Sequence, residues 1–107
     1  MSENIKSEGE EQAQEQESIQ VDIDEETSFG KYANLTLSFF SREEFILDFA
    51  FLQSQIKKAK IRSRVILTPK NAKRLADLLN QQIEEYEEKI GPITGEAQPP
   101  HIDLSIN

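Results

Sequence analysis

The chain has 107 residues, of which 36% are hydrophobic, and a formal net charge of −8 at pH 7. This length allows one small domain, and the low apolar content with high charge indicates that part of the chain is not packed. Because there is no cysteine, a disulfide framework and thiolate chemistry are excluded. No apolar run approaches the roughly 18 residues that span a bilayer, so we expect a soluble, cytoplasmic protein without membrane contact.

The N-terminal residues 1–17 carry six Glu against a single Lys. Their only large apolar residues are Met1 and Ile5, which is too little to offset the entropy cost of ordering the segment. We therefore predict a disordered acidic tail over 1–17, a single domain over 18–91 and a flexible, Pro-containing tail over 92–107.

Three segments alternate apolar and polar residues with the period of a β-strand. Ile19, Val21 and Ile23 have the pattern of an edge strand with charge on its solvent side. Two further rows flank a short polar connection: Leu35, Leu37 and Phe39, then Phe45, Leu47, Phe49 and Phe51. These two rows predict a hairpin whose apolar faces point the same way.

The segment from Ile61 to Leu67 predicts the next strand, with Ile61, Val65 and Leu67 on its apolar face. Gln53 to Lys58 is a polar connection that leads into it. Thr68 and Pro69 then give the start signal of a helix, because the Thr hydroxyl can accept from a free N–H and Pro has its φ preset.

This helix continues to Gly91 and Pro92, which are typical of a helix end. Its apolar residues follow a four-three spacing: Ala72, Ala76, Leu79, Ile83, Tyr86 and Ile90. We therefore predict an α+β fold, an antiparallel sheet of three or four strands followed by one long amphipathic C-terminal helix that covers the Phe row.

Several short motifs along this order resemble one family: Tyr32-Ala33-Asn34, Glu44-Phe45, Asp48-Phe49, Ser63-Arg64-Val65, and Thr68-Pro69 followed by Ala72-Lys73 and Tyr86-Glu87. In combination they resemble a family of small prokaryotic proteins known as domain of unknown function 3467. The resemblance covers roughly residues 19–91. It implies a self-contained domain and carries no activity, cofactor or catalytic residue.

No segment carries a catalytic or cofactor-binding signature, so we expect a protein that is not an enzyme and binds no cofactor or metal. His101 follows two prolines in the predicted tail, without a Ser or Cys nucleophile on a rigid element nearby. Four acidic residues lie close together but lack the Gly turn and distal Glu of a calcium loop: Asp22, Asp24, Glu25 and Glu26.

Three polar residues lie in or next to the apolar strands. Asp48 and Arg64 each lie on the face opposite the apolar row of its strand, so they pair if the strands are neighbours. Asn34 closes the turn before its strand in the simplest interpretation. A ligand site built from Asn34, Asp48 and Arg64 is the alternative.

A basic run lies between positions 57 and 74, where no Asp or Glu occurs: Lys57, Lys58, Lys60, Arg62, Arg64, Lys70, Lys73 and Arg74. Such a strip can meet phosphates or an acidic protein surface. Against nucleic acid stand the negative total charge and the lack of interleaved aromatic residues that stack on bases.

The helix carries its end charges in the unfavourable order. Lys70, Lys73 and Arg74 lie at the positive end of the helix dipole, whereas Glu84, Glu85, Glu87 and Glu88 lie at its negative end. An antiparallel second copy of the helix would make these charges complementary. We therefore expect a homodimeric adaptor or subunit with an unknown protein partner. The residues of the expected interface are Ala76, Leu79, Ile83, Tyr86 and Ile90. The alternative is a nucleic-acid-associated protein that uses residues 57–74.

Overall fold

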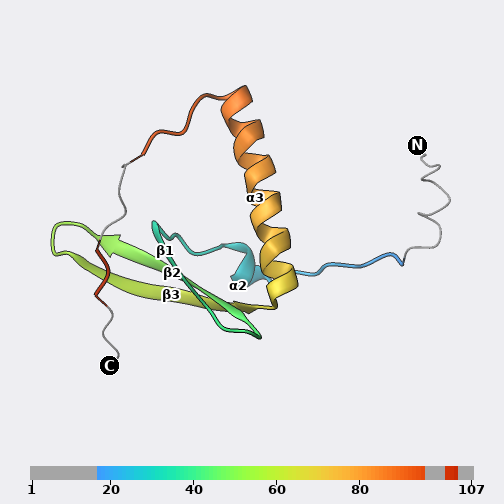
Figure 1. Cartoon of the computed structure of the whole chain (residues 1–107), viewed down its shortest axis with the longest axis horizontal. Coiled ribbons are helices and arrows are strands. Elements are labelled where there is room, and N and C mark those ends of the chain that lie inside the picture. The colour runs from blue at the N-terminus through green and yellow to red at the C-terminus, as the bar shows by residue number, and fades with distance from the viewer. Residues whose placement is uncertain (1–16, 96–100, 104–107) are drawn as a thin grey trace. The chain divides into compact units, whose positions relative to one another are not determined.

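The structure, a computed structural model, describes residues 17–95 and 101–103. The chain divides into two units after Lys31. The sheet and the long helix belong to the second unit, which begins at Tyr32 (Figure 1). The tail predicted over 1–17 lies almost wholly outside the described residues, and so do 96–100 and 104–107 of the C-terminal tail.

The first unit contains one short helix, α2 (Glu25–Ser28), within its described residues. Asp24 caps it, since the backbone N–H of Thr27 donates to Asp24 Oδ2 over 3.2 Å. Residues 19–23 belong to no strand, and Val21 is 85% exposed. The expectation of a strand here is wrong, because an alternating pattern supplies a face to bury but no neighbouring strand to bond with.

The second unit holds an antiparallel sheet with strand order β1-β2-β3: β1 (Leu35–Phe40), β2 (Phe45–Gln53) and β3 (Lys58–Leu67). β2 therefore lies in the centre, as its nearly continuous apolar sequence favours. The sheet, followed by the long helix, confirms the predicted α+β class with three strands.

The register of the hairpin differs from the prediction. Phe40 pairs with Phe45, so every odd-numbered residue of β1 lies opposite an even-numbered residue of β2, as Leu37 does opposite Asp48. The predicted apolar rows of the two strands therefore point to opposite faces. The reason is the four-residue connection, since the length of a hairpin loop sets which residues are partners.

Alternation along β2 defines two faces, which we name by their residues. The Phe face carries Phe45, Leu47, Phe49 and Phe51, and the Asp48 face carries Ile46, Asp48, Ala50 and Leu52. Both faces are mainly apolar. A sheet of this kind needs cover on each side.

A bulge in β3 changes the face of its first half. Ser63 pairs with Phe49 and Ile61 pairs with Ala50, which leaves Arg62 as an extra residue. Ile61 consequently lies on the Asp48 face, whereas Val65 lies on the Phe face opposite Leu47. The predicted single apolar face of Ile61, Val65 and Leu67 is thus divided between the two sides of the sheet.

The helix α3 (Pro69–Lys89) begins after a single residue, Thr68, that follows the last residue of β3. Thr68 is extended, and its hydroxyl accepts from the backbone N–H of Asn71 over 3.2 Å. At the other end the N–H of Gly91, with φ +147°, donates to the carbonyl of Tyr86. Both predicted ends of the helix are confirmed to within one residue.

Candidate interaction surface

Asp48 and Arg64 form a two-pronged ion pair across β2 and β3, at directly opposite positions of the register. Arg64 Nε donates to Asp48 Oδ1 over 2.7 Å, and an Nη group donates to Oδ2 over 2.8 Å. The Asp48 carboxyl is fully covered, whereas the Arg64 side chain is 56% exposed. The predicted pairing of these two residues is therefore confirmed.

The pair changes the titration of both groups. Hydrogen bonds from Arg64 hold the pKa of Asp48 below its ordinary value, against a smaller opposing effect of lost hydration. The same bonds, together with the carboxylate charge, raise the pKa of Arg64. Because Asp48 stays ionised and fully bonded, we infer that it anchors the register of β2 and β3 and does not act as an acid or base.

Asn34 does not join this pair. Its side-chain Oδ1 accepts from the N–H of Leu52 over 2.7 Å, and its Nδ2 donates to the carbonyl of the same residue over 3.1 Å. The Asn34 backbone N–H also donates to the carbonyl of Ala50 over 3.0 Å. The amide side chain thus extends the β1–β2 ladder by one pair. This supports the structural role that we considered first.

The Asp48 face is closed at its centre. Asp48 and Ala50 have no exposed surface, and the Arg64 guanidinium contacts the Asp48 carboxylate. They are the buried residues in the part of the chain that the structure describes. A domain with so small a core is unusual, since folding depends on apolar burial.

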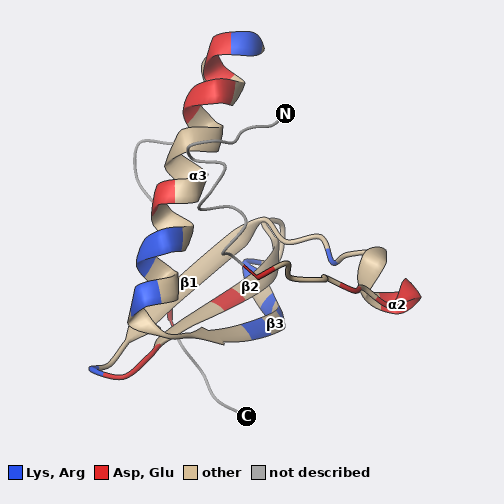
Figure 2. Ribbon diagram, turned by 90° about the vertical axis from the view of Figure 1, so that its right-hand side faces the viewer, with Lys and Arg blue, Asp and Glu red and all other residues tan. Residues whose placement is uncertain are grey.

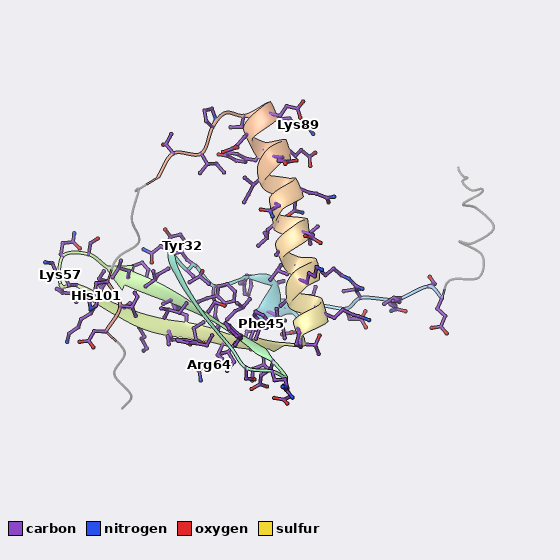
Figure 3. The ribbon with its side chains drawn as sticks, in the orientation of Figure 1. Tyr32, Phe45, Lys57, Arg64, Lys89 and His101 are labelled. Carbon is purple, nitrogen blue, oxygen red and sulfur yellow. The ribbon has the colours of Figure 1, made fainter. Side chains whose placement is uncertain are left out.

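The Phe face remains open. Its four β2 side chains are only half-buried. Phe40 stacks on Phe45 with ring centres 5.6 Å apart, and Tyr32 meets Phe51 edge-on with ring centres 6.0 Å apart. Figure 3 shows Tyr32 and Arg64 on opposite sides of the sheet.

The helix α3 does not cover this face. It has no buried residue, and its contacts with the sheet are mainly to β3, from which it continues directly. The predicted interface residues are all exposed: Ala76, Leu79 at 47%, Ile83 at 43%, Tyr86 at 47% and Ile90 at 71%. The expectation that the helix covers the Phe row is not met within one copy of the chain.

The one-residue connection at Thr68 explains this arrangement. Packed layers of secondary structure lie about 10 Å apart, whereas one residue spans at most about 3.5 Å. A helix that starts one residue after a strand therefore cannot both rise to the next layer and turn back along its own sheet. The signal was present in the sequence, where Leu67, Thr68 and Pro69 are consecutive.

The charges of α3 are divided along its length (Figure 2). Lys70, Lys73 and Arg74 occupy the first turns, Asp77 lies midway, and the last turns hold the four glutamates together with Lys89. Two of those acidic residues have partners, since Lys89 Nζ bonds Glu85 Oε2 over 2.8 Å and the N–H of Ile93 donates to Glu87 Oε2 over 2.9 Å.

The basic run of residues 57–74 is divided by the fold into three groups. Lys57 ends the β2–β3 turn with φ +53°, and Lys58 and Lys60 follow on the Phe face, opposite Gln53 and Phe51. Arg64 lies on the other face in its ion pair, and Arg62 is the bulge residue that precedes it. The third group begins α3. Side chains on both sides of a sheet and on a helix do not form one continuous strip.

The remaining candidates are exposed. His101 is on the surface, and Asp24 uses its carboxylate as a helix cap, which lowers its pKa through the hydrogen bond from Thr27. Among residues 17–95 and 101–103, no three His, Asp or Glu side chains are grouped as a metal site would require. The same residues include no helix with the length and apolarity to cross a bilayer.

One acidic site was missed at the sequence level. Glu43 and Glu44 lie in the connection between β1 and β2, at the same end of the sheet as the start of α3. Leu67 pairs with Phe45, which shows why these segments meet. The register of β2 and β3 places this connection, which also holds Arg42, at the opposite end of β2 from Lys58 and Lys60.

Comparison with known proteins gives one family. The family model described as "Protein of unknown function (DUF3467)" matches residues 1–95. No curated protein and no solved structure matches the chain significantly.

Proposed function

Since the chain belongs to the DUF3467 family, whose description assigns no activity, we propose that it is a non-enzymatic interaction module that functions as a homodimer, as an adaptor or subunit. The observation that carries this proposal is the exposed apolar stripe of α3 beside an open Phe face. A second copy of the chain has apolar surfaces that can cover both the α3 stripe and the Phe face. Exposed apolar areas of this extent are typical of interaction sites.

The small size of the domain supports the same proposal. Asp48 and Ala50 are the buried side chains among the described residues, and the α3 helix buries none. A domain of about 70 residues is marginal even with a complete core, and oligomerisation is a common way to complete one. Association would bury leucine, isoleucine and aromatic side chains at about 25 cal/mol per Å².

Sedimentation equilibrium of the full chain tests the proposal. We expect a dimer at micromolar concentration, and Ile83→Lys should shift it toward monomer because a charge then lies in the centre of the stripe. Gln81→Lys is the matched control, since it adds the same charge on the side of α3 opposite the stripe and should leave the dimer intact. A parent chain that stays monomeric at high micromolar concentration overturns the proposal.

Nucleic-acid association is the second candidate, favoured by the exposed Lys57, Lys58 and Lys60 at one end of the sheet. A salt-dependent gel shift with mixed DNA and RNA tests it. A shift that the triple change to Gln abolishes would support this candidate. Equal mobility with and without the protein at low salt would exclude it.

A further inference from the structure

The Phe face and the α3 stripe are two exposed apolar surfaces of the same chain, and the fold prevents them from meeting within one copy. Thr68 alone connects β3 to α3, so the helix leaves the sheet at its end. We infer that α3 of one copy lies along the Phe face of a second copy, parallel to its β2, with each sheet covered by the other copy's helix. This inference rests on the proposed homodimer and specifies its interface.

The lengths of the two surfaces match. α3 has 21 residues and β3 has 10, which corresponds to about 31 Å of helix and about 33 Å of strand. The helix stripe continues from Ala76 to Ile90, and the Phe row continues along β2 from Phe45 to Phe51. Each surface can therefore cover the other over its whole length.

Charge determines the direction of the helix on the sheet. β2 has Lys58 and Lys60 beside its last residues, on the Phe face, and follows the β1–β2 connection, which holds Arg42, Glu43 and Glu44, at its other end. A second copy's helix that runs parallel to β2 brings its basic first turns to the glutamates. Its acidic last turns then reach the two lysines. The opposite direction places the basic first turns beside Lys58 and Lys60.

The spacing of these charges agrees as well. From Lys70 to Glu87 the helix advances about 26 Å, at about 1.5 Å per residue. From Phe45 to Gln53, the partner of Lys58, β2 advances about 26 Å at about 3.3 Å per residue. The reversed end charges, which are unfavourable for the isolated helix, thus have a partner at each end of the sheet.

The Phe face carries no charged side chain at its centre, where β1 and β3 contribute Thr36, Ser38 and Ser63. On the Asp48 face the central residues Asp48 and Ala50 are already fully covered. Docking a helix there would also place apolar side chains on the half-exposed Arg64 guanidinium, at the cost of its hydration. The Phe face has neither obstacle at its centre.

Cysteine cross-linking in this cysteine-free chain tests the inference. Single variants Lys58→Cys and Glu87→Cys are mixed, equilibrated and treated with a mild oxidant or a short thiol-specific cross-linker. We expect a covalent heterodimer of the two variants. Ala59→Cys replaces Lys58→Cys as the control, because it neighbours Lys58 and lies on the opposite face, opposite Leu52. It should give at least several-fold less product.

In the alternative arrangement, two α3 helices pack antiparallel against each other. A different cysteine variant detects this arrangement. Asn80→Cys lies near the middle of the helix, so it should cross-link to itself in that arrangement. A dimer by sedimentation that gives the Asn80 product and no 58–87 product overturns the sheet-and-helix interface while the homodimer stands. A chain that is monomeric by sedimentation overturns both.

Discussion

Asp48 and Arg64 lie directly opposite each other in β2 and β3, and the guanidinium donates to both carboxylate oxygens over 2.7 and 2.8 Å. The acid is fully covered, and the base covers it while remaining half in solvent. Since the pair forms only in one register of the two strands, it selects that register. Its removal should therefore weaken the sheet without altering any residue of the Phe face.

Replacing Arg64 by Ala should lower the free energy of unfolding by about 1 to 3 kcal/mol. Breaking a fully buried ion pair would cost about 3 to 5 kcal/mol of stability. Here the cost is smaller, because water can reach part of the space that the Arg64 side chain leaves. Urea denaturation measures the effect. The double variant Asp48→Ala with Arg64→Ala should be less destabilised than the sum of the single variants, because neither then leaves an unpaired charge. Additive effects would contradict the pairing.

The stability contribution of Asp48 should depend on pH. Arg64 holds the folded-state pKa of Asp48 below its ordinary value of 3.8. As pH falls, the Asp48 carboxylate is therefore protonated at a higher pH in the unfolded chain than in the folded chain. The contribution is therefore present above the ordinary pKa and is lost as pH falls through the lower folded-state pKa. The difference in urea midpoint between the parent and Asp48→Asn should shrink below about pH 4. A constant difference down to about pH 2 would refute this prediction.

Asn34→Asp should destabilise the sheet by about 1 to 3 kcal/mol at neutral pH. The carboxylate retains the acceptor for the N–H of Leu52 but loses the donor to the Leu52 carbonyl, and it places a negative charge beside that oxygen. At acid pH the protonated Asp can donate again, so part of the loss should be recovered. Asn34→Ala serves as the control, since its loss should not change with pH.

Lys57→Gly should stabilise the hairpin of β2 and β3 by about 0.5 to 1 kcal/mol. Lys57 has φ +53°, a conformation that costs a residue with a Cβ about 1 to 2 kcal/mol, of which the flexibility of Gly offsets about half. Thermal unfolding measures the gain. Lys57→Ala removes the charge but not the strain, so it should show no gain; an equal gain there would assign the effect to charge.

The end charges of α3 separate the two dimer arrangements. Lys73→Glu with Arg74→Glu should weaken the dimer at low salt by a few tenths of a kcal/mol per contact. The same changes favour the isolated helix, so a weaker dimer is not a loss of helix. Adding Glu84→Lys and Glu88→Lys should weaken it further when the helix lies on the sheet. Restored affinity in sedimentation equilibrium would instead indicate antiparallel helices.

Sequence patterns determined the elements whose signals are local. Thr68 and Pro69 began α3 where predicted, and the periodicity of the helix and of the Phe row identified their apolar faces. The pairing of Asp48 with Arg64 was also predictable, because each residue departs from the apolar pattern of its own strand. The alternation at residues 19–23 was misleading, since a strand requires a partner that periodicity does not supply.

Only the tertiary structure decided which rows share a face and what they can contact. The four residues between Phe40 and Phe45 set which residues of β1 and β2 share a face of the sheet. The bulge at Arg62 places Ile61 on the Asp48 face. Periodicity within each strand contains neither fact, because both depend on hydrogen bonds between strands. The same register places Phe45 and Lys58 at opposite ends of one apolar face, which the linear order of the residues conceals.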